Sequence, residues 1–511
     1  MPKAKPNILL ITSDQQHYDT LGVTNPRIKT PSLDRLASEG TRFERAYCPN
    51  PTCTPTRASL ITGMYPSQHG AWTLGTKLYE DVPVVGDQFR SAGYATGLLG
   101  KGHFQTLYGA KGMESLEAHD RLRDLDFWRG FHGPWYGFEH IEINRNHAFD
   151  LHVGQHYAIW MEDNGLKNWR DYFEDWPRDG KSDKYSRLSA RRVWELPEEF
   201  HYSRWTADRT IAHIERSLAE GRPFLTWASF PDPHPFCTAP EPWASMYDPE
   251  EMVPGRLTPG EHDCNPLHFR LTQQPGRPDF SAYRDKDGGI GHGFHSHVKD
   301  EQEYRKELAA YYGMVSLMDH HIGRIVDALN RLGVADDTLV VFTSDHGHFL
   351  GQHGLHFKGA FHYEDMIRVP MIVRWPGRVP AGGVSNAIQS LVDFAPTFLA
   401  AAGMDIPGVM TGVNQLETWQ GGQAVRDHAI VENHHSPTKI HLRTFVTQRH
   451  KITVYRSGED GELFDLQEDP GEVNNLWHDP AAGALKSRML HEFVQAVLGY
   501  EPMRMPRIAG A

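Results

Sequence analysis

The sequence predicts an α/β fold around a large mixed, mostly parallel β-sheet, and two observations support this. Short apolar runs recur along the chain, and helical patterns separate them. Continuous apolar runs are typical of strands buried on both faces, and their alternation with helices favours parallel pairing. The predicted strands cover residues 7–12, 94–99, 224–229 and 338–343, with residues 371–374 as a fifth candidate.

The helical patterns carry recognisable start and stop signals. A helix is expected from Pro31, with Thr30 as its N-cap residue, because proline suits the first helical position. A second helix is expected after Pro55 and should end at Gly63, where glycine allows a left-handed cap. A long pattern covers about residues 301–332. Helices of this length between strands provide the crossovers that parallel pairing requires.

Two long segments of low periodicity and a change in the sequence pattern near the C-terminus complete the predicted domain organisation. Residues 104–200 and 232–300 are rich in Gly, Pro, Asp, His and aromatic residues and show little periodicity, so we expect excursions over the sheet that shape a pocket. After about residue 420, short alternating segments and a helix near 484–498 favour antiparallel pairing. We therefore expect an α/β domain over residues 1–420 and a smaller antiparallel α+β domain with a tail over residues 421–511.

Composition excludes several classes of protein. The 511 residues carry 52 Lys and Arg against 65 Asp and Glu, a formal net charge of −13, which argues against a nucleic-acid-binding protein. No apolar stretch approaches the roughly 20 residues of a membrane helix. The chain opens without a signal-peptide pattern and has only four cysteines, too few for a disulfide framework, so we expect a cytoplasmic protein.

The most specific feature is the segment from Cys53 to Gly63, which reads Cys-Thr-Pro-Thr-Arg-Ala-Ser-Leu-Ile-Thr-Gly. A thiol just before a helix that begins at proline lies in the positive field of the helix N-terminus, where thiolates and anions are stabilised. Arg57 follows one turn later. For an isolated Cys-x-Pro, a half-buried structural cysteine is the competing interpretation.

Polar clusters elsewhere decide between these interpretations. Cys-x-Pro-x-Arg with Gly63 resembles the motif of the sulfatase family, in which a maturation enzyme oxidises the cysteine to formylglycine. Further segments occur in the family's order, and the region after residue 460 is similar to the family's C-terminal domain. The resemblance implies an alkaline-phosphatase-like fold. Its segments are Asp14, Gly100–His103, Pro233–His234, Ser344–Gly347, His353–Gly354 and Lys358–Gly359.

The resemblance implies hydrolysis of sulfate monoesters by a metal-bound formylglycine hydrate made from Cys53. A hydrated aldehyde carries two hydroxyl groups on one carbon. One attacks sulfur in line, and deprotonation of the other expels sulfate and restores the aldehyde. A plain serine cannot be regenerated in this way.

The strand ends provide candidate metal ligands. Asp14 and Asp345 offer the hard oxygen atoms that a divalent cation prefers. The resemblance adds Gln15, His346 and the modified Cys53. Many sulfatases have Asp-Asp and Asp-Asn at these places, whereas this chain has Asp-Gln and Asp-His, as in choline sulfatases and phosphonate monoester hydrolases. One carboxylate fewer and one imidazole more soften the site, so manganese is an alternative to calcium.

The remaining catalytic candidates are positively charged or titratable. The resemblance implies that Arg57 and Lys101 hold the formylglycine hydrate, that His103 accepts the proton when the hemiacetal collapses, and that His234 and Lys358 neutralise sulfate and protonate the leaving oxygen. Positive groups are what a transferring sulfuryl centre requires. Each of these residues alone is more typical of a solvated surface or of a structural histidine.

Several questions stay open at this level. A phosphonate monoester or phosphate diester hydrolase with the same site is the nearest alternative, and a non-catalytic binding protein with unmodified Cys53 is a remote one. Aromatic residues at 127–138 are expected either to stack on a substrate or to anchor loops. The tail over residues 501–511 suggests a homo-oligomer, and the expected partners are a small sulfate ester and the formylglycine-generating enzyme.

Overall fold

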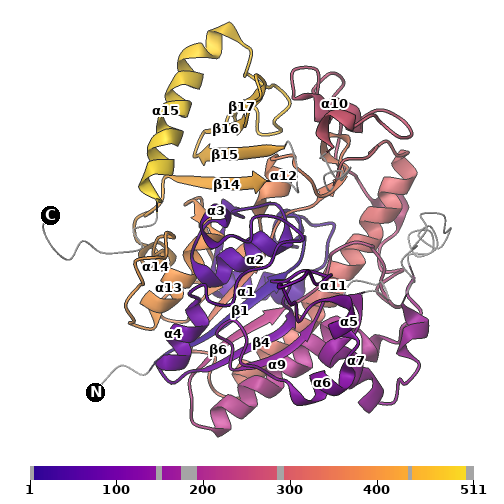
Figure 1. Ribbon diagram of the computed structural model, residues 1–511, viewed down its shortest axis with the longest axis vertical. Helices are drawn as coiled ribbons and strands as arrows, with labels where there is room; N and C mark the ends of the chain where they lie inside the picture. Colours follow the sequence, from indigo (N-terminus) through magenta and orange to yellow (C-terminus); the bar gives the residue numbers. More distant parts are fainter. Residues whose placement is uncertain (1–4, 146–151, 174–192, 285–292, 435–439, 502–511) are drawn as a thin grey trace, which may run out of the picture.

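The computed structural model describes residues 5–145, 152–173, 193–284, 293–434 and 440–501. Within these residues, the main sheet has eight strands, and the expected helices lie on both of its faces (Figure 1). Strand pairings show that β11 runs opposite to the others. In spatial order the strands are β12 (Gly383–Ser385), β2 (Thr41–Phe43), β11 (Met371–Arg374), β7 (Thr338–Ser344), β1 (Asn7–Ser13), β6 (Phe224–Ser229), β4 (Ala95–Lys101) and β5 (His140–Asn144).

Alternation along the buried strands divides the apolar core between the two faces. Leu9 and Ile11 of β1 join the cluster that contains helices α1 (Pro31–Glu39), α9 (Tyr202–Ala219) and α11 (Glu301–Arg331). Ile8 and Leu10 join the cluster on the other face. That face is covered by α2 (Cys53–Thr62), α4 (Val85–Ser91) and α13 (Phe394–Ala401). The period of two along a strand explains why an entirely apolar run is needed at the centre of the sheet.

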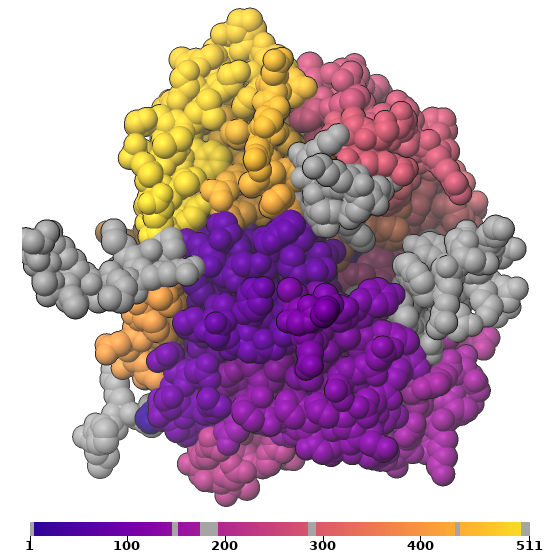
Figure 2. Space-filling view, viewed as in Figure 1, coloured from indigo at the N-terminus to yellow at the C-terminus, as the bar shows by residue number. Residues whose placement is uncertain are grey.

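The C-terminal region forms a second sheet. Its strands pair antiparallel in chain order and pack against the last helix, α15 (Gly483–Gly499), through Ile430, Phe445 and Phe493. The sheet and α15 lie together at one end of the molecule (Figures 1 and 2). Its strands are β14 (His428–His434), β15 (His441–Thr447), β16 (His450–Tyr455) and β17 (Gly461–Asp465).

Smaller elements connect these layers. The short strands form a three-stranded sheet, β10-β3-β13, and the hairpin β8-β9. The remaining helices lie in the connections. The strands are β3 (Ala46–Tyr47), β8 (Phe349–Leu350), β9 (His356–Phe357), β10 (Arg368–Val369) and β13 (Gln389–Ser390), and the α-helices are α3 (Pro66–His69), α5 (His119–Leu122), α6 (Leu125–Gly130), α7 (Gln155–Asp163), α10 (Leu267–Thr272), α12 (Glu364–Ile367) and α14 (Leu416–Trp419).

Some local predictions need correction. Residues 104–200 are not only an excursion, because β5 lies within them and pairs with β4 as an edge strand. Helix α2 begins at Cys53, two residues before Pro55. Strand β4 runs on through Lys101, beyond the predicted end at residue 99, because hydrogen bonds to its neighbours continue that far. The tail over residues 502–511 lies outside the described residues, so the prediction of a homo-oligomer drawn from it stays a prediction.

No helix among the described residues combines the length and the apolar character needed to cross a lipid bilayer.

Candidate active site

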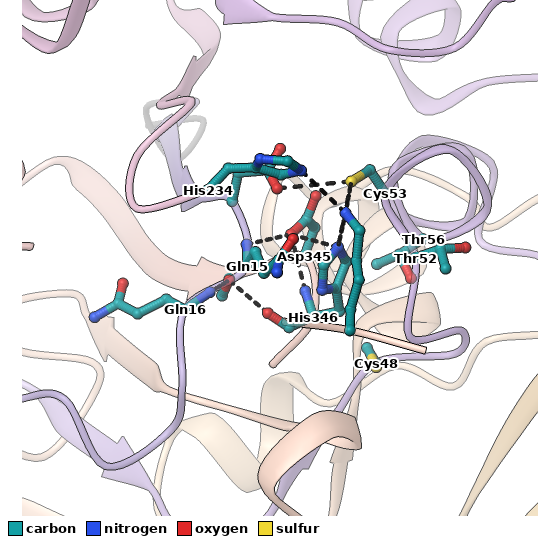
Figure 3. A network of polar contacts seen from close by, with 12 residues as sticks. Gln15, Gln16, Cys48, Thr52, Cys53, Thr56, His234, Asp345 and His346 are labelled. Atoms are coloured by element: carbon teal, nitrogen blue, oxygen red, sulfur yellow. Dashed lines mark hydrogen bonds and ion pairs between the residues drawn. The ribbon is translucent and has the colours of Figure 1, made fainter. Parts of the chain in front are cut away.

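The carboxyl ends of the parallel strands bring the predicted site residues together. Asp14 follows β1, Lys101 ends β4, and Asp345 follows β7. His234 lies in the loop after β6, and Cys53 opens α2 beside them. Figure 3 shows Cys53, His234 and Asp345 converging on one point. In a parallel sheet these strand ends share one edge, which explains how residues far apart in sequence meet.

Two buried carboxylates are bound by two buried cations. Asp14 forms an ion pair with Lys101 and a second one, of 3.3 Å, with Arg57 Nη2. Arg57 Nε donates to Asp345 Oδ2 at 2.9 Å, and Nη1 donates to Ser229 Oγ at 2.7 Å. Burial alone would raise the pKa of Asp14, but Lys101 and the neighbouring cationic groups hold it well below its usual value. Asp14 is therefore an anion in the folded protein.

Arg57 contacts these carboxylates rather than Cys53. Its Nη1 also donates to the Lys101 carbonyl oxygen at 3.0 Å. In the unmodified chain it thus orients Asp14 and Asp345, whereas the resemblance implies a contact with the formylglycine hydrate. A planar guanidinium suits this task, because it offers several donors in fixed directions.

The thiol of Cys53 lies among three polar groups. Its Sγ is 3.1 Å from Lys358 Nζ, 3.3 Å from His346 Nε2 and 3.6 Å from Asp14 Oδ1. Burial raises the pKa of Cys53, and the negative charge of Asp14 raises it further. Burial and the charge of Asp14 thus outweigh the expected stabilisation of a thiolate by the helix N-terminus. A neutral buried thiol is a poor nucleophile, and this agrees with a need to convert the side chain before reaction.

The side chains beside Cys53 fit a divalent cation. Gln15 Oε1 is buried without a hydrogen-bond partner among the described residues, while Gln15 Nε2 donates to His348 Nδ1 at 2.8 Å. His346 Nδ1 lies 3.0 Å from the carbonyl oxygen of Gly347. Donation there leaves the lone pair of His346 Nε2 facing the cluster, where Cys53 Sγ and Lys358 Nζ lie 3.3 and 3.4 Å away. One ligand atom from each of Asp14, Cys53, Asp345 and His346 lies within 4.8 Å of the others.

These donors match the predicted metal set. Two carboxylates, one amide oxygen and one imidazole nitrogen are a donor set that calcium or manganese accepts. Gln15 Oε1 fits the role of a metal ligand, because a buried amide oxygen without a partner among the described residues is costly. The four protein ligands Asp14, Gln15, Asp345 and His346 would hold the ion beside position 53.

Lys358 and His234 form a hydrogen-bonded pair at the site. Lys358 Nζ is 3.1 Å from His234 Nε2, and His234 Nδ1 is 2.6 Å from the carbonyl oxygen of Pro235. Donation from Nδ1 to that carbonyl makes Nε2 the acceptor of a Lys358 proton. Burial lowers the pKa of His234 well below its usual value, and Lys358 lowers it further. His234 is therefore neutral, and the ammonium group of Lys358 carries the positive charge.

His103 is held in an unusual conformation near the same pocket. Its backbone has φ 61°, a left-handed value that is uncommon outside glycine, and its N–H donates to Glu117 Oε1 at 2.6 Å. Burial and then the charge of Arg145 lower the pKa of His103 well below its usual value. A neutral imidazole with an unpartnered Nδ1 among the described residues can accept a proton.

A pocket of about 500 Å³ opens over Cys53. One part of its wall is polar and holds the predicted residues, and the other part is apolar. The polar residues are Gln15, Cys53, His103, Arg145, His152, His234 and Lys358; the apolar ones include Leu74, Leu107, Met113, Phe236 and Phe357.

The aromatic run at 127–138 packs into the protein interior. Trp128, Trp135, Tyr136 and Phe138 are buried members of the main core cluster, and none of them lines this pocket. The loop-anchoring interpretation of these residues is therefore the one that the structure supports. The pocket wall contains instead aromatic residues that sequence reasoning passed over, namely Tyr108, Phe236 and Phe357.

Sequence reasoning also missed Arg145, His152 and Ser229. Arg145 directly follows β5, in a stretch that showed no clear periodicity, and Ser229 is the last residue of β6. The alternation in His-Ile-Glu-Ile-Asn, which forms β5, was the signal that could have located the edge strand and the polar residue after it.

Comparisons with known proteins agree with this geometry. Residues 6–404 match the family described as Sulfatase, and residues 351–497 match the family described as N-sulphoglucosamine sulphohydrolase, C-terminal. An arylsulfatase of Clostridium perfringens is 28% identical over 92% of this chain and 90% of its own length. A choline-sulfatase of Rhizobium meliloti is 26% identical over 94% of this chain and 84% of its own.

A solved structure shows the same architecture. The phosphonate monoester hydrolase of Silicibacter pomeroyi superposes with a TM-score of 0.78 at 23% identity, covering 98% of this chain and 96% of that one. The fold is that of the alkaline phosphatase superfamily. Since the family match spans most of the sequence, the chain belongs to the sulfatase family. It is an enzyme of the sulfuric ester hydrolase class.

Proposed function

We propose that this enzyme hydrolyses sulfate monoesters with a formylglycine hydrate at position 53 as the nucleophile. The observation that supports this most strongly is the position of Cys53, within 3.6 Å of a carboxylate, an imidazole and an ammonium group. The pKa of its thiol is raised, so the unmodified side chain is unsuited to attack. A divalent cation bound by Asp14, Gln15, Asp345 and His346 would supply Lewis-acid stabilisation of negative charge on a sulfate oxygen.

The chain's own residues divide the remaining work. Arg57 and Lys101 hold the two carboxylates in place. Lys358 faces position 53 and shares a hydrogen bond with His234, so it is placed to neutralise sulfate and to donate a proton to the leaving oxygen. His103, neutral and on the same pocket wall, is the proposed acceptor of the proton when sulfate is released.

The modification is tested by mass spectrometry of the tryptic peptide over residues 46–57. The peptide contains both Cys48 and Cys53, so it carries its own control. After co-expression with a formylglycine-generating enzyme, we expect fragment ions to place a mass loss at position 53 and an intact cysteine at position 48. Unmodified thiol at both positions in active enzyme would disprove the mechanism.

Two variants test the nucleophile. Cys53→Ala should abolish turnover of an aryl sulfate while the thermal midpoint stays near that of the wild type. Cys53→Ser should be equally inactive, because a serine sulfate ester cannot collapse to an aldehyde. Retention of most activity in either variant would place the nucleophile elsewhere.

A phosphonate monoester or phosphate diester hydrolase is the second candidate. The observation that favours it is a group of three cations: Lys358 contacts Cys53, and Arg57 and Lys101 pair with the neighbouring Asp14. Phosphoryl transition states gather more negative charge than sulfuryl ones, so more cations suit them. Comparing kcat/KM for matched aryl sulfate and aryl phosphonate esters decides between the two candidates.

Four further expectations belong to this proposal. The maturation enzyme is the expected protein partner, and calcium or manganese the expected ion. A cytoplasmic location agrees with four cysteines that form no disulfide. A homo-oligomer is expected and is tested by the molar mass from light scattering.

A further inference from the structure

Arg145 is a buried cation whose charge the described residues leave only partly balanced. It follows β5, whose residue Asn144 pairs in register with Lys101 of β4, so it lies beside the strand end that carries the site. Its residue exposure is 7%, and it forms part of the pocket wall that also holds Cys53. A guanidinium in such a place needs acceptors, because burying a charge without partners is costly.

Its hydrogen bonds to other described residues all come from one nitrogen. Nη1 donates to the carbonyl oxygens of Gln105 at 3.0 Å and of Glu117 at 3.2 Å. Among the described residues no acceptor lies within hydrogen-bond distance of Nε or Nη2, and neither atom is sealed from solvent. The Nε and Nη2 edge is the fork that binds a carboxylate through two parallel hydrogen bonds.

The carboxylate of Glu117 does not form that pair. Glu117 attracts Arg145, but its two carboxylate oxygens accept from the backbone N–H groups of His103 and Gln105, at 2.6 and 2.7 Å. Within the described part of the chain, Arg145 has no carboxylate partner within 4.0 Å. Burial lowers the pKa of Arg145 by more than the negative charge of Glu117 raises it. An anion in the pocket would relieve this cost.

The rest of the wall indicates what carries that anion. Leu74, Leu107, Met113, Phe236 and Phe357 provide an apolar surface suited to an aryl ring or another apolar body. The neighbouring cations Lys358 and Lys101 already serve position 53 and Asp14. The sulfate group at position 53 thus has cationic neighbours apart from Arg145.

We propose that the Nε and Nη2 fork of Arg145, in the wall of the partly apolar pocket over Cys53, selects sulfate esters whose alcohol portion carries a second anionic group of the carboxylate kind. This inference rests on the proposed function and names its substrate class. The carboxylate accepts two hydrogen bonds from Nε and Nη2, and the sulfate remains at position 53. No covalent bond to the carboxylate forms or breaks.

The test compares 4-carboxyphenyl sulfate with its neutral counterpart of similar shape, 4-carbamoylphenyl sulfate. The ratio of the two kcat/KM values is measured for wild type and Arg145→Gln, so that intrinsic differences in ester reactivity cancel. We expect the variant's ratio to fall about 10- to 100-fold, the value of a charged bidentate contact. The loss should appear with the carboxylate ester, while the amide ester changes little.

Matched variants separate this role from a structural one. Arg129→Gln removes an exposed arginine that pairs with Asp163 and should keep the wild-type ratio. Arg145→Lys retains the charge without the fork and should lose most of the preference; it also serves if the glutamine variant does not fold. An unchanged ratio in Arg145→Lys or Arg145→Gln, or an equal fall with both esters, overturns the proposal.

Failure of the proposed function gives a different pattern. If the converted wild type hydrolyses neither ester, sulfate ester hydrolysis is disproved, and the same two compounds are then compared by calorimetric dissociation constants on the same variants. If the carboxylate ester binds at least tenfold more tightly than the amide ester, and Arg145→Gln loses this difference, the anion site at Arg145 is supported. Equal binding of the two esters disproves it.

Discussion

Replacing Arg57 by methionine tests whether one buried cation holds both site carboxylates together. Methionine keeps much of the aliphatic volume but removes the charge and every donor. Asp14 then retains Lys101, and Asp345 retains the N–H groups of Gln15 and His346, at 3.0 and 2.9 Å. The change therefore removes a central partner from two carboxylates that have no exposure to water.

The expected loss of stability follows from this burial. Breaking a fully buried ion pair from one side costs about 3–5 kcal/mol, because the remaining charge is left uncompensated. The partners that Asp14 and Asp345 keep place the expected value near the lower end, at about 3 kcal/mol. Urea unfolding followed by tryptophan fluorescence, in buffer with chelator, measures the change as a shift of the midpoint at constant slope.

An exposed ion pair provides the control. Arg35 donates to Asp327 at 2.8 Å, with side-chain exposures of 41% and 64%, and Arg35→Met should cost no more than about 1 kcal/mol. If Arg57→Met unfolds with the same midpoint as Arg35→Met, the two carboxylates are not held by Arg57 and the reasoning on the site's electrostatics is wrong.

Three further predictions concern the ion and two buried titratable groups. Dialysis against chelator should lower the thermal midpoint of unfolding. Calcium or manganese at 100 times its dissociation constant for the wild type should restore about 2.7 kcal/mol of stability to the wild type but much less to Asp345→Asn, as scanning calorimetry would show. Burial alone would lower the pKa of His353, but Asp365 and Glu261 raise it to about 9. The charge of His353 therefore stabilises the folded state by at most about 3 kcal/mol. In urea unfolding, His353→Gln should lose all of this stability below pH 6.5, and its difference from wild type should vanish as the pH rises through 9. Burial raises the pKa of Glu462 to about 7, so the folded state holds that proton more tightly; Glu462→Gln should raise the unfolding midpoint at pH 8 and leave it unchanged at pH 4, and a loss at pH 8 would contradict this.

The parts of the fold that depend on local signals could be predicted from the sequence. The bounds of β6 and β11 agree with the predicted runs, because a strand buried on both faces must be apolar along its whole length. The Cys53 segment indicated its chemistry because residues at fixed spacing on one helix keep fixed relative positions. The division into residues 1–420 and 421–511 stays a prediction.

The tertiary structure decided the strand directions and the contacts between distant segments. That β11 runs antiparallel to β7 depends on the path between them, which no apolar run encodes. The role of Arg57 depends on Asp14 and Asp345, which meet only because β1 and β7 pair in register.

The sequence by itself determined which chemical groups the enzyme possesses, and in which local motifs. The tertiary structure decided which of them face each other, and it placed Arg145 in the pocket through the pairing of β5 with β4. The physical reason is that spacing along a helix or strand is set by local geometry, whereas charge balance and burial are properties of the assembled pocket, to which distant segments contribute.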